Sequence, residues 1–265
     1  MAAAVQNGLD PLLMPTEGPL DATLLASRIC AQQPDPLILA AGGDGTVNGV
    51  LNGLTPGKAT LGVIPLGTSN VLARELKIHS IEDALRRVAV GNSRTVTVGE
   101  VACAGQKRRF LLMVGAGVDG AVVQGLRLRE KRVFGKGAYL LSALRVVFAW
   151  DSEQLQVAGG GRSLSCHSVI ICNAGRYGGN FRLAPEVDIF SPAFQVVCIT
   201  GGRCGYLKLF LLLAMGRFAA GSSVESFAAS ELQVTGGKPI QVDGDFFGCG
   251  SLRIKTIPGF VRLIV

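Results

Sequence analysis

The sequence predicts an α/β domain with a parallel sheet, followed by a second domain built on antiparallel sheets. Two segments near the N-terminus share one order of features, in which a short apolar run leads into a glycine-rich loop and then into apolar residues at helical spacing. That order is typical of parallel βα units. After about residue 92 the pattern changes to short β-rich runs. We therefore expect an α/β domain over residues 1–92 and a β-rich domain over residues 93–265.

The first of these segments follows a helical pattern over Ala22–Cys30. Leu37–Ala41 is an unbroken apolar run, which is typical of a buried parallel strand. The loop GGDGT follows at once, and apolar residues then recur at helical spacing at Val47, Val50, Leu51 and Leu54. The second segment repeats this order, with a strand over Leu61–Ile64, the loop PLGTSN over Pro65–Asn70 and a helix over Val71–Leu76.

Ser80 precedes Glu82 and Asp83 at the start of a further apolar stripe, so it is expected to be a helix N-cap. The later β-rich runs are Thr95–Cys103, Phe110–Val114, Cys166–Cys172, Phe194–Thr200, Ile240–Asp243 and Phe260–Val265. Helical stretches interrupt them around Lys136–Ala149 and Tyr206–Ala220. A boundary near residue 92 predicts a cleft between the domains, and such clefts are common ligand sites. Whether the C-terminal segment packs back on the first domain is left open.

Composition indicates a folded protein whose partner carries negative charge. The 265 residues are 48% hydrophobic and only 17% charged, which excludes extensive disorder. The net charge of +7 suits nucleotide phosphates, an anionic membrane or nucleic acid, and its sign does not choose among them. Basic and apolar residues are interleaved over residues 126–145. This segment is either a membrane-surface element or a core helix with a solvated edge.

Seven cysteines contain no C-x-x-C pair, which argues against structural zinc and against a disulfide framework. No apolar stretch reaches the roughly 18–20 residues that a membrane-spanning helix needs. The first fifteen residues lack the basic and apolar regions of a secretory signal. We therefore expect a cytoplasmic protein without a transmembrane segment.

The glycines of GGDGT suit a phosphate site. Gly42, Gly43 and Gly45 are expected to allow a tight, positive-φ backbone and to leave no side chain between the backbone and a ligand. The amide groups and the positive end of the next helix attract an anion, and Thr46 can cap that helix or donate its hydroxyl. Asp44 would repel phosphate unless a cation or a hydroxyl donor is present, so it indicates Mg–nucleotide handling or polarisation of a substrate hydroxyl. The alternative is a tight turn without a ligand.

The second loop strengthens the nucleotide interpretation. Gly67, Thr68, Ser69 and Asn70 repeat the strand–loop–helix context with side chains that suit phosphate or ribose. Both loops should open at the same edge of the sheet. Asn48, one turn into the first helix, is also expected to hydrogen-bond the ligand.

Five segments, taken in order, resemble the diacylglycerol kinase catalytic-domain family, which also holds sphingosine kinases and bacterial lipid kinases and is related to NAD kinases. They are GGDGTVNGVLNGL, LGVIPLGTSNVLARELKI, GKGAYL, NAGRYGGNFRLAPE and IQVDGD. The resemblance runs from about residue 12 to the C-terminus. GGDGT alone also resembles NAD kinases and phosphofructokinases, whereas the ordered set is much more specific.

The resemblance implies a three-layer α/β nucleotide domain and a β-sandwich-like domain, with ATP between them and a lipid hydroxyl as the acceptor. Asp245 matches the family's proton acceptor, a Glu, and Asp243 is the adjacent acid of that motif; the alternative for both is a solvated turn. Mg²⁺ is expected to arrive with ATP, so no metal ligands of the protein's own are expected. The expected nucleotide-binding residues are Thr16, Gly42, Gly43, Asp44, Gly45, Thr46, Val47, Asn48, Gly67, Thr68 and Asn70.

The sequence departs from the family in four places. An N-P-x-[SA]-G loop does not precede residue 12, so the first strand–helix unit of the family is expected to be missing. Val71 stands where many relatives have an Asp, and Thr97 stands at another acidic position. Ser191–Phe194 replaces a loop that holds a structural Mg²⁺ in some bacterial relatives.

The resulting hypothesis is an ATP-dependent lipid kinase of phospholipid biosynthesis, with a diacylglycerol-like acceptor. Asp245 or Asp44 accepts the hydroxyl proton, and Asp243 orders the site. The alternatives are an NAD kinase-type phosphotransferase and a catalytically degenerate nucleotide- or lipid-binding protein. The expected partner is a lipid at the inner face of the membrane, not nucleic acid, and a homodimer is compatible with the sequence.

Overall fold

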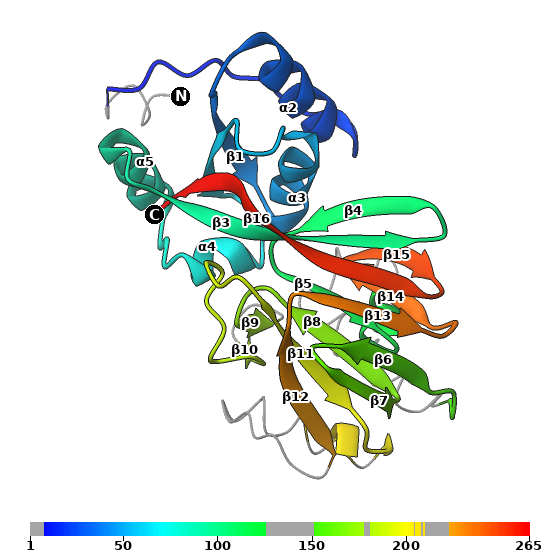
Figure 1. The fold of residues 1–265 in the computed structure, drawn as a ribbon. Helices are drawn as coiled ribbons and strands as arrows, with labels where there is room; N and C mark the ends of the chain where they lie inside the picture. Colours follow the sequence, from blue (N-terminus) through cyan, green and yellow to red (C-terminus); the bar gives the residue numbers. More distant parts are fainter. Residues whose placement is uncertain (1–7, 126–150, 178–180, 204, 208, 210–222) are drawn as a thin grey trace. The chain divides into compact units, whose positions relative to one another are not determined.

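The computed structural model describes residues 8–125, 151–177, 181–203, 205–207, 209 and 223–265. The chain divides into two compact units (Figure 1). The first contains Met1–Val98 and Ile257–Val265, and the second contains Gly99–Thr256. Strands β3 (Ser93–Cys103) and β16 (Leu252–Ile264) each begin in one unit and end in the other. The boundary expected near residue 92, and the cleft expected there, stay predictions.

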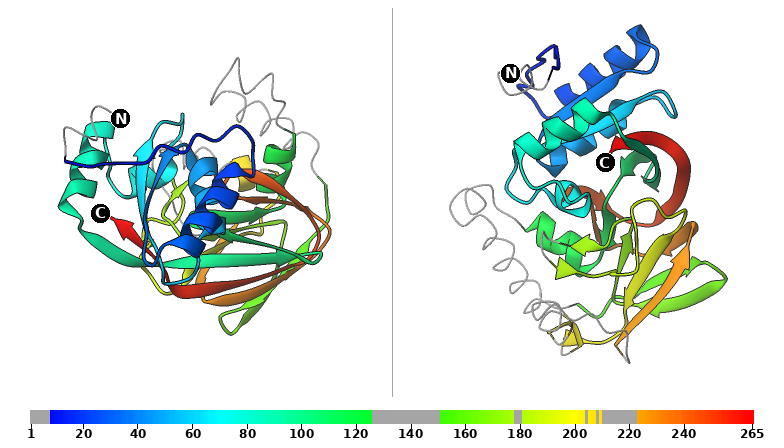
Figure 2. Two further views of the ribbon diagram at one scale, coloured as in Figure 1. Left: turned by 90° about the horizontal axis from the view of Figure 1, so that it is seen from above. Right: turned by 90° about the vertical axis from the view of Figure 1, so that its left-hand side faces the viewer.

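The first unit is a three-layer α/β domain. Its elements are α2 (Asp21–Gln32), β1 (Leu37–Gly42), α3 (Asp44–Gly53), β2 (Thr60–Pro65), α4 (Val71–Glu75) and α5 (Ile81–Val90). Strands β1 and β2 are parallel, and the end of β16 also pairs with β2 in parallel. Helices α2 and α3 lie on one face of this sheet and α5 lies on the other (Figures 1 and 2). The βα units predicted over residues 37–76 are therefore confirmed.

Strand β1 is less buried than its apolar sequence predicts. Ile38 and Ala40 are buried, but Leu37 is 48% exposed and Ala41 is also exposed. Among the described residues β1 pairs only with β2, so it is an edge strand. The predicted parallel strand is confirmed, but it is only partly buried, because an apolar run does not reveal how many neighbours a strand has.

Helices α2 and α3 pack closely because two glycines of α3 face α2. A Cβ at Gly49 would lie 2.9 Å from Cβ of Ala22, and a Cβ at Gly53 would lie 2.2 Å from the carbonyl oxygen of Thr23. The Thr23 hydroxyl donates to the carbonyl oxygen of Gly49 at 2.8 Å. This contact fixes the helix that begins at the first glycine-rich loop.

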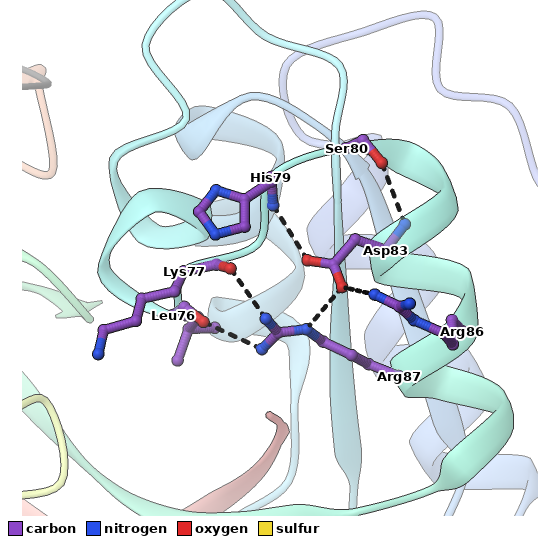
Figure 3. A network of polar contacts seen from close by, with 7 residues as sticks. All are labelled: Leu76, Lys77, His79, Ser80, Asp83, Arg86 and Arg87. Carbon is purple, nitrogen blue, oxygen red and sulfur yellow. Dashed lines mark hydrogen bonds and ion pairs between the residues drawn. The ribbon is translucent and has the colours of Figure 1, made fainter.

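The predicted N-cap at Ser80 is confirmed. The Ser80 Oγ accepts a hydrogen bond from the amide of Asp83 at 3.1 Å, and the Asp83 carboxylate accepts from the amide of His79 at 3.1 Å (Figure 3). This reciprocal arrangement is close to a capping box, and it fixes where α5 begins.

Asp83 and Arg87 together connect α5 to the end of α4. The Asp83 carboxylate contacts Arg86 at 2.7 Å and Arg87 at 3.3 Å (Figure 3). The Arg87 guanidinium donates to the carbonyl oxygens of Leu76 and Lys77 at 3.1 and 2.8 Å. The hydrogen bonds from Arg86 and from the amide of His79 hold the pKa of the Asp83 carboxyl far below its ordinary range. The segment that follows the second glycine-rich loop is thus anchored at its far end.

The second unit is a β-sandwich. One sheet has the order β12-β11-β8-β5-β14-β15. The facing sheet includes β16, β13, β6 and β7, with β3 beside β16 and β4 beside β3. The core between them includes Phe110 and Phe194, whose rings stack with centroids 5.4 Å apart. The other elements of this unit are β4 (Gln106–Phe110), β5 (Met113–Ala116), α6 (Val118–Gln124), β6 (Leu155–Gly159), β7 (Arg162–Cys166), β8 (Ser168–Cys172), β9 (Arg176–Tyr177), β10 (Phe181–Arg182), β11 (Phe194–Ile199), β12 (Val224–Ala229), β13 (Glu231–Thr235), β14 (Pro239–Val242) and β15 (Asp245–Cys249).

Two predicted strands of the second unit are each divided by a corner. Phe110–Val114 breaks at Leu111 and Leu112, and Cys166–Cys172 breaks at His167. At each corner the chain passes from one sheet of the sandwich to the other. At the first corner the residues stay apolar throughout, so the pattern cannot reveal the break. At the second corner His167 and Ser168 are polar but buried, and they stand beside the break.

Part of the helical prediction lies outside the described residues. This holds for Lys136–Ala149 and for all but a few residues of Tyr206–Ala220. Among the helices that the structure does describe, none combines the length and the apolar character needed to cross a membrane.

We predict that Gly53→Ala destabilises the protein although alanine is the better helix former. Alanine is favoured over glycine by about 1 kcal/mol in a helix, but the new methyl group would collide with the backbone of α2. Because overpacking typically costs about 1–3 kcal/mol, we expect the free energy of unfolding in urea to fall by roughly 1–2 kcal/mol.

Gly45→Ala is the matched control, since a Cβ there meets no atom within 4 Å. It should leave the stability unchanged or slightly raised. Equal effects of the two substitutions would contradict the packing argument.

Candidate functional site

The first glycine-rich loop joins β1 to α3 without left-handed backbone. Gly42 ends the strand and Gly43 is the N-cap of α3, with φ of −90°. None of Gly42, Gly43 and Gly45 has a positive φ, so that prediction was wrong. Gly42 instead allows a neighbouring side chain to lie close to the backbone. A Cβ at Gly42 would lie 2.4 Å from Oγ1 of Thr46, whereas Gly45 is exposed and faces open space.

The second loop is closed by its own asparagine. Asn70 adopts the left-handed conformation, with φ of 46°. Its Oδ1 accepts from the amide of Gly67 at 2.9 Å, and its Nδ2 donates to the carbonyl oxygen of Gly67 at 2.7 Å. The side chain expected to touch a ligand therefore holds the loop together. Thr68 lies exposed within the closed loop.

The two loops lie against each other, as predicted for loops at one sheet edge. A Cβ at Gly67 would lie only 2.5 Å from Cα of Gly43. The amide of Leu66 donates to the carbonyl oxygen of Gly42 at 3.1 Å. Glycine is required at position 67 because any side chain there would separate the loops.

Asp44 locks this arrangement. Its Oδ2 accepts from the amide of Val71 at 3.0 Å, and its Oδ1 accepts from the amide of Leu72 at 3.1 Å. These are the first two amides of α4, so a carboxylate of one loop caps the helix that follows the other. A role of Asp44 with a metal ion or a proton stays a prediction, but the structure gives its negative charge a local partner.

The other expected nucleotide-binding residues differ in accessibility. Val47 and Asn48 are buried in α3, and the Asn48 Oδ1 accepts from Nδ2 of Asn52 at 3.1 Å. Thr46 is partly exposed one turn into α3, and Thr16 is exposed in the irregular segment before α2. Within the two loops and the start of α3, Gly45 and Thr68 are exposed, whereas Asn48 is buried.

Asp243 of the second unit is a buried backbone anchor. It is 9% exposed and has a φ of 49°. Its Oδ2 accepts from the amide of Leu111 at 3.0 Å, and its Oδ1 accepts from the amides of Leu112 and Met113, both at 2.9 Å. Its own amide donates to the carbonyl oxygen of Met113 at 3.0 Å. Asp243 thus holds the corner at which the chain leaves β4 for β5.

Asp245 has a different environment two residues later. It begins β15, its side chain is 49% exposed, and its Oδ2 lies 2.9 Å from Nη2 of Arg108. The Asp245 side chain is therefore far more accessible than the buried Asp243. The expectation that Asp44 and Asp245 face one ligand stays a prediction.

The sequence analysis gave no role to several polar residues of the second unit that make buried contacts in the structure. Asn173 supports the corner from its other side, since Nδ2 donates to the carbonyl oxygen of Leu111 at 2.9 Å. Asp119 lies buried beside Gln241 and Tyr177. The only sequence signal was their position in the glycine-flanked segments GVDG, NAGRYGG and IQVDGD. In the part of the chain that is described, no cluster of three or more His, Cys, Asp or Glu side chains is arranged to bind a metal ion.

A three-layer α/β unit with two interlocked glycine-rich loops, joined to a β-sandwich, defines the class of the protein. Residues 3–101 match the family described as diacylglycerol kinase catalytic domain, and residues 112–265 match the YegS C-terminal NAD kinase beta sandwich-like domain. The chain belongs to the diacylglycerol kinase catalytic-domain family. The predicted family and fold class are therefore confirmed.

Individual relatives agree with this placement. A diacylglycerol kinase of Bacillus subtilis (strain 168) is 27% identical over 239 residues, which cover 86% of this chain and 77% of the relative. A structure from Bacillus anthracis str. Sterne, assigned as a diacylglycerol kinase, has a TM-score of 0.80 at 21% identity and covers 99% of this chain and 88% of that chain. An NAD kinase from Archaeoglobus fulgidus in complex with ATP has a TM-score of 0.50 at 14% identity, with 94% and 90% covered.

The two acids of the VDGD turn should differ sharply in their effect on stability. Asp243→Ala leaves three amides without their acceptor, and each unsatisfied buried group costs about 1–3 kcal/mol. We expect the free energy of unfolding to fall by at least about 3 kcal/mol. Asp245→Asn breaks one partly exposed ion pair and should cost about 1 kcal/mol or less.

Chemical denaturation of both variants measures this difference. Similar losses would show that Asp243 is not the anchor that its contacts indicate.

Proposed function

We propose that this protein is an ATP-dependent lipid kinase that transfers the γ-phosphoryl group to the hydroxyl of a diacylglycerol-like lipid. The observation that carries the proposal is the interlocked pair of glycine-rich loops, in a chain of the diacylglycerol kinase catalytic-domain family. Asp44 holds the two loops together, and exposed backbone remains at the N-terminal end of α3.

The first loop fits a phosphate group. The space beside Gly45 is open, and a methyl group there would occupy the room that a phosphate oxygen needs to reach the amides. The partial positive charge at the start of α3 favours an anion. The negative charge of Asp44 does not fully cancel the attraction of an anion to the start of α3, because the amides of Val71 and Leu72 stabilise that charge. We therefore assign Asp44 to loop positioning rather than to proton transfer.

Asp245 is the proposed proton acceptor. Its carboxylate is half-exposed, and Arg108 orients it from one side. When bound, MgATP supplies the γ-phosphoryl group and brings its own metal ion. Asp245 accepts the hydroxyl proton as the lipid oxygen bonds to the γ-phosphorus, while the bond to the β-phosphate bridging oxygen breaks and ADP leaves. Asp243 contributes by fixing the turn from which Asp245 projects.

The family relatives named diacylglycerol kinase favour a diacylglycerol-like acceptor. We further propose that the protein acts in phospholipid metabolism, at the cytoplasmic face of a membrane. An NAD kinase activity is the second candidate, since an NAD kinase shares the fold. A catalytically degenerate binding protein is the third, because Val71 and Thr97 replace acidic residues of many relatives.

A radiolabel assay and a calorimetric binding measurement together distinguish the three candidates. Radiolabelled ATP is incubated with the protein and either diacylglycerol in mixed micelles or NAD. The proposal predicts label in the lipid, and we expect Asp245→Asn to lower kcat by about 10²–10⁴-fold, the usual contribution of general base catalysis. Label in NAD alone would favour the second candidate. ATP binding by calorimetry without label in either acceptor would favour the third.

Gly45→Ala tests the nucleotide loop separately. Its methyl group enters space that is empty in the protein, so stability should stay the same or rise slightly. If phosphate occupies that space, the KM for ATP should rise about tenfold, corresponding to about 1.4 kcal/mol of lost binding. The KM for the lipid should change less than twofold. An unchanged KM for ATP would contradict a phosphate site at Gly45.

A further inference from the structure

A buried carboxylate lies in the second unit, outside the residues to which the proposed reaction gives a role. Asp119, at the start of α6, is 5% exposed. Burial raises the pKa of its carboxyl, while the hydrogen bonds from Tyr177 and Gln241 act in the opposite direction. Within the described residues its hydrogen-bond partners are the neutral side chains of Tyr177 and Gln241, and burying an acid among neutral groups is costly. Such a residue is therefore a candidate for a specific role.

The surrounding backbone leaves room for this acid. A Cβ at Gly115, on β5, would lie 1.8 Å from Oδ2 of Asp119. A Cβ at Gly120 would lie 2.0 Å from the carbonyl oxygen of Pro239, so α6 approaches β14 directly. The amide of Gly117 also donates to the carbonyl oxygen of Pro239 at 3.0 Å. Glycines on two elements thus hold Asp119 against the strand that leads into VDGD.

The contacts of Asp119 continue into the VDGD turn. Its Oδ1 accepts from the hydroxyl of Tyr177, and its Oδ2 accepts from Nε2 of Gln241 at 2.6 Å. The Gln241 Oε1 in turn accepts from the amide of Gly244 at 2.7 Å. Gly244 lies between Asp243 and Asp245 and has a φ of 88°.

The direction of these hydrogen bonds gives Asp119 control of the turn. A primary amide has one donor end and one acceptor end. Because the carboxylate accepts from the NH₂ group of Gln241, the carbonyl oxygen of Gln241 must face the other way, toward the amide of Gly244. An apolar residue at position 119 would leave Gln241 free to rotate.

We propose that Asp119 is a positioning residue, which acts through Gln241 and Gly244 to fix the turn that carries Asp245. Asp243 fixes one side of this turn to the β4–β5 corner, and the Asp119–Gln241 pair fixes its other side to α6. The effect on catalysis rests on the proposed function, whereas the effect on the turn itself does not.

The test exchanges the donor and the acceptor of the hydrogen bond between Asp119 and Gln241. Gln241→Glu places two carboxylates side by side, so the new side chain should move away and release Gly244. Combining it with Asp119→Asn restores a donor opposite an acceptor, because the asparagine NH₂ can donate to the new carboxylate, whose other oxygen accepts from Gly244. Gln233→Glu, at an exposed position on β13, controls for the added negative charge.

For the kinase reaction, we expect Gln241→Glu to lower kcat at least tenfold and to change the KM for ATP less than twofold. The double variant should recover most of kcat, and Gln233→Glu should match the parent protein. A residue that only stabilises the fold would alter the unfolding transition without this split between kcat and KM. An unchanged kcat in folded Gln241→Glu, or no recovery in the double variant, would overturn the proposal.

A second measurement does not depend on activity. Hydrogen exchange at the Gly244 amide, followed by NMR, should accelerate at least tenfold in Gln241→Glu and return toward the parent rate in the double variant. If the parent protein phosphorylates no lipid but Gly244 behaves in this way, the proposed function fails and the positioning role stands. Equal exchange rates in all variants would refute the positioning role even in an active kinase.

Discussion

The contact on which the second unit depends is the buried carboxylate of Asp243 against three successive amides. The chain must leave one sheet of the sandwich at Phe110 and enter the other at Met113. Backbone amides in such a corner lack ladder partners, and burying them unpaired is costly. Asp243 supplies both oxygens to the amides, and Asn173 bonds the carbonyl oxygen of Leu111. One side chain therefore fixes the sheet crossing and the start of the VDGD turn together.

Asp44 plays the equivalent part in the first unit. Both aspartates belong to glycine-containing segments that suggest catalysis, yet each binds two or more main-chain amides. A carboxylate oxygen that already accepts amide hydrogen bonds has fewer lone pairs left for a substrate. The structure thus favours a division of tasks, in which Asp44 and Asp243 hold backbone in place and Asp245 keeps an accessible carboxylate.

The sequence was sufficient for features that local patterns encode. The βα units and the Ser80 cap depend on residues close together in the chain, so periodicity and capping chemistry predicted them. The roles of the loop glycines were not accessible in this way. Gly67 is constrained by Gly43 of another loop, and Gly115 by the carboxylate of Asp119. The corner at Leu111 was also hidden, because both of its sides are apolar. Asp119, Gln241 and Tyr177 form a site only once α6, β9 and β14 are assembled.

Residue 245 is an aspartate, so the contacts that hold the VDGD turn in place become more important. If Asp245 serves where the family has Glu, its carboxylate is one methylene closer to the backbone, and a flexible side chain can no longer compensate for a displaced turn. Catalytic groups lose efficiency when they are misplaced by about 1 Å. The turn is held by Asp243 on one side and by Gln241 on the other, while Arg108 orients the carboxylate itself. Under the proposed function, this rigid support is what allows a short acid to reach the substrate hydroxyl from a fixed position.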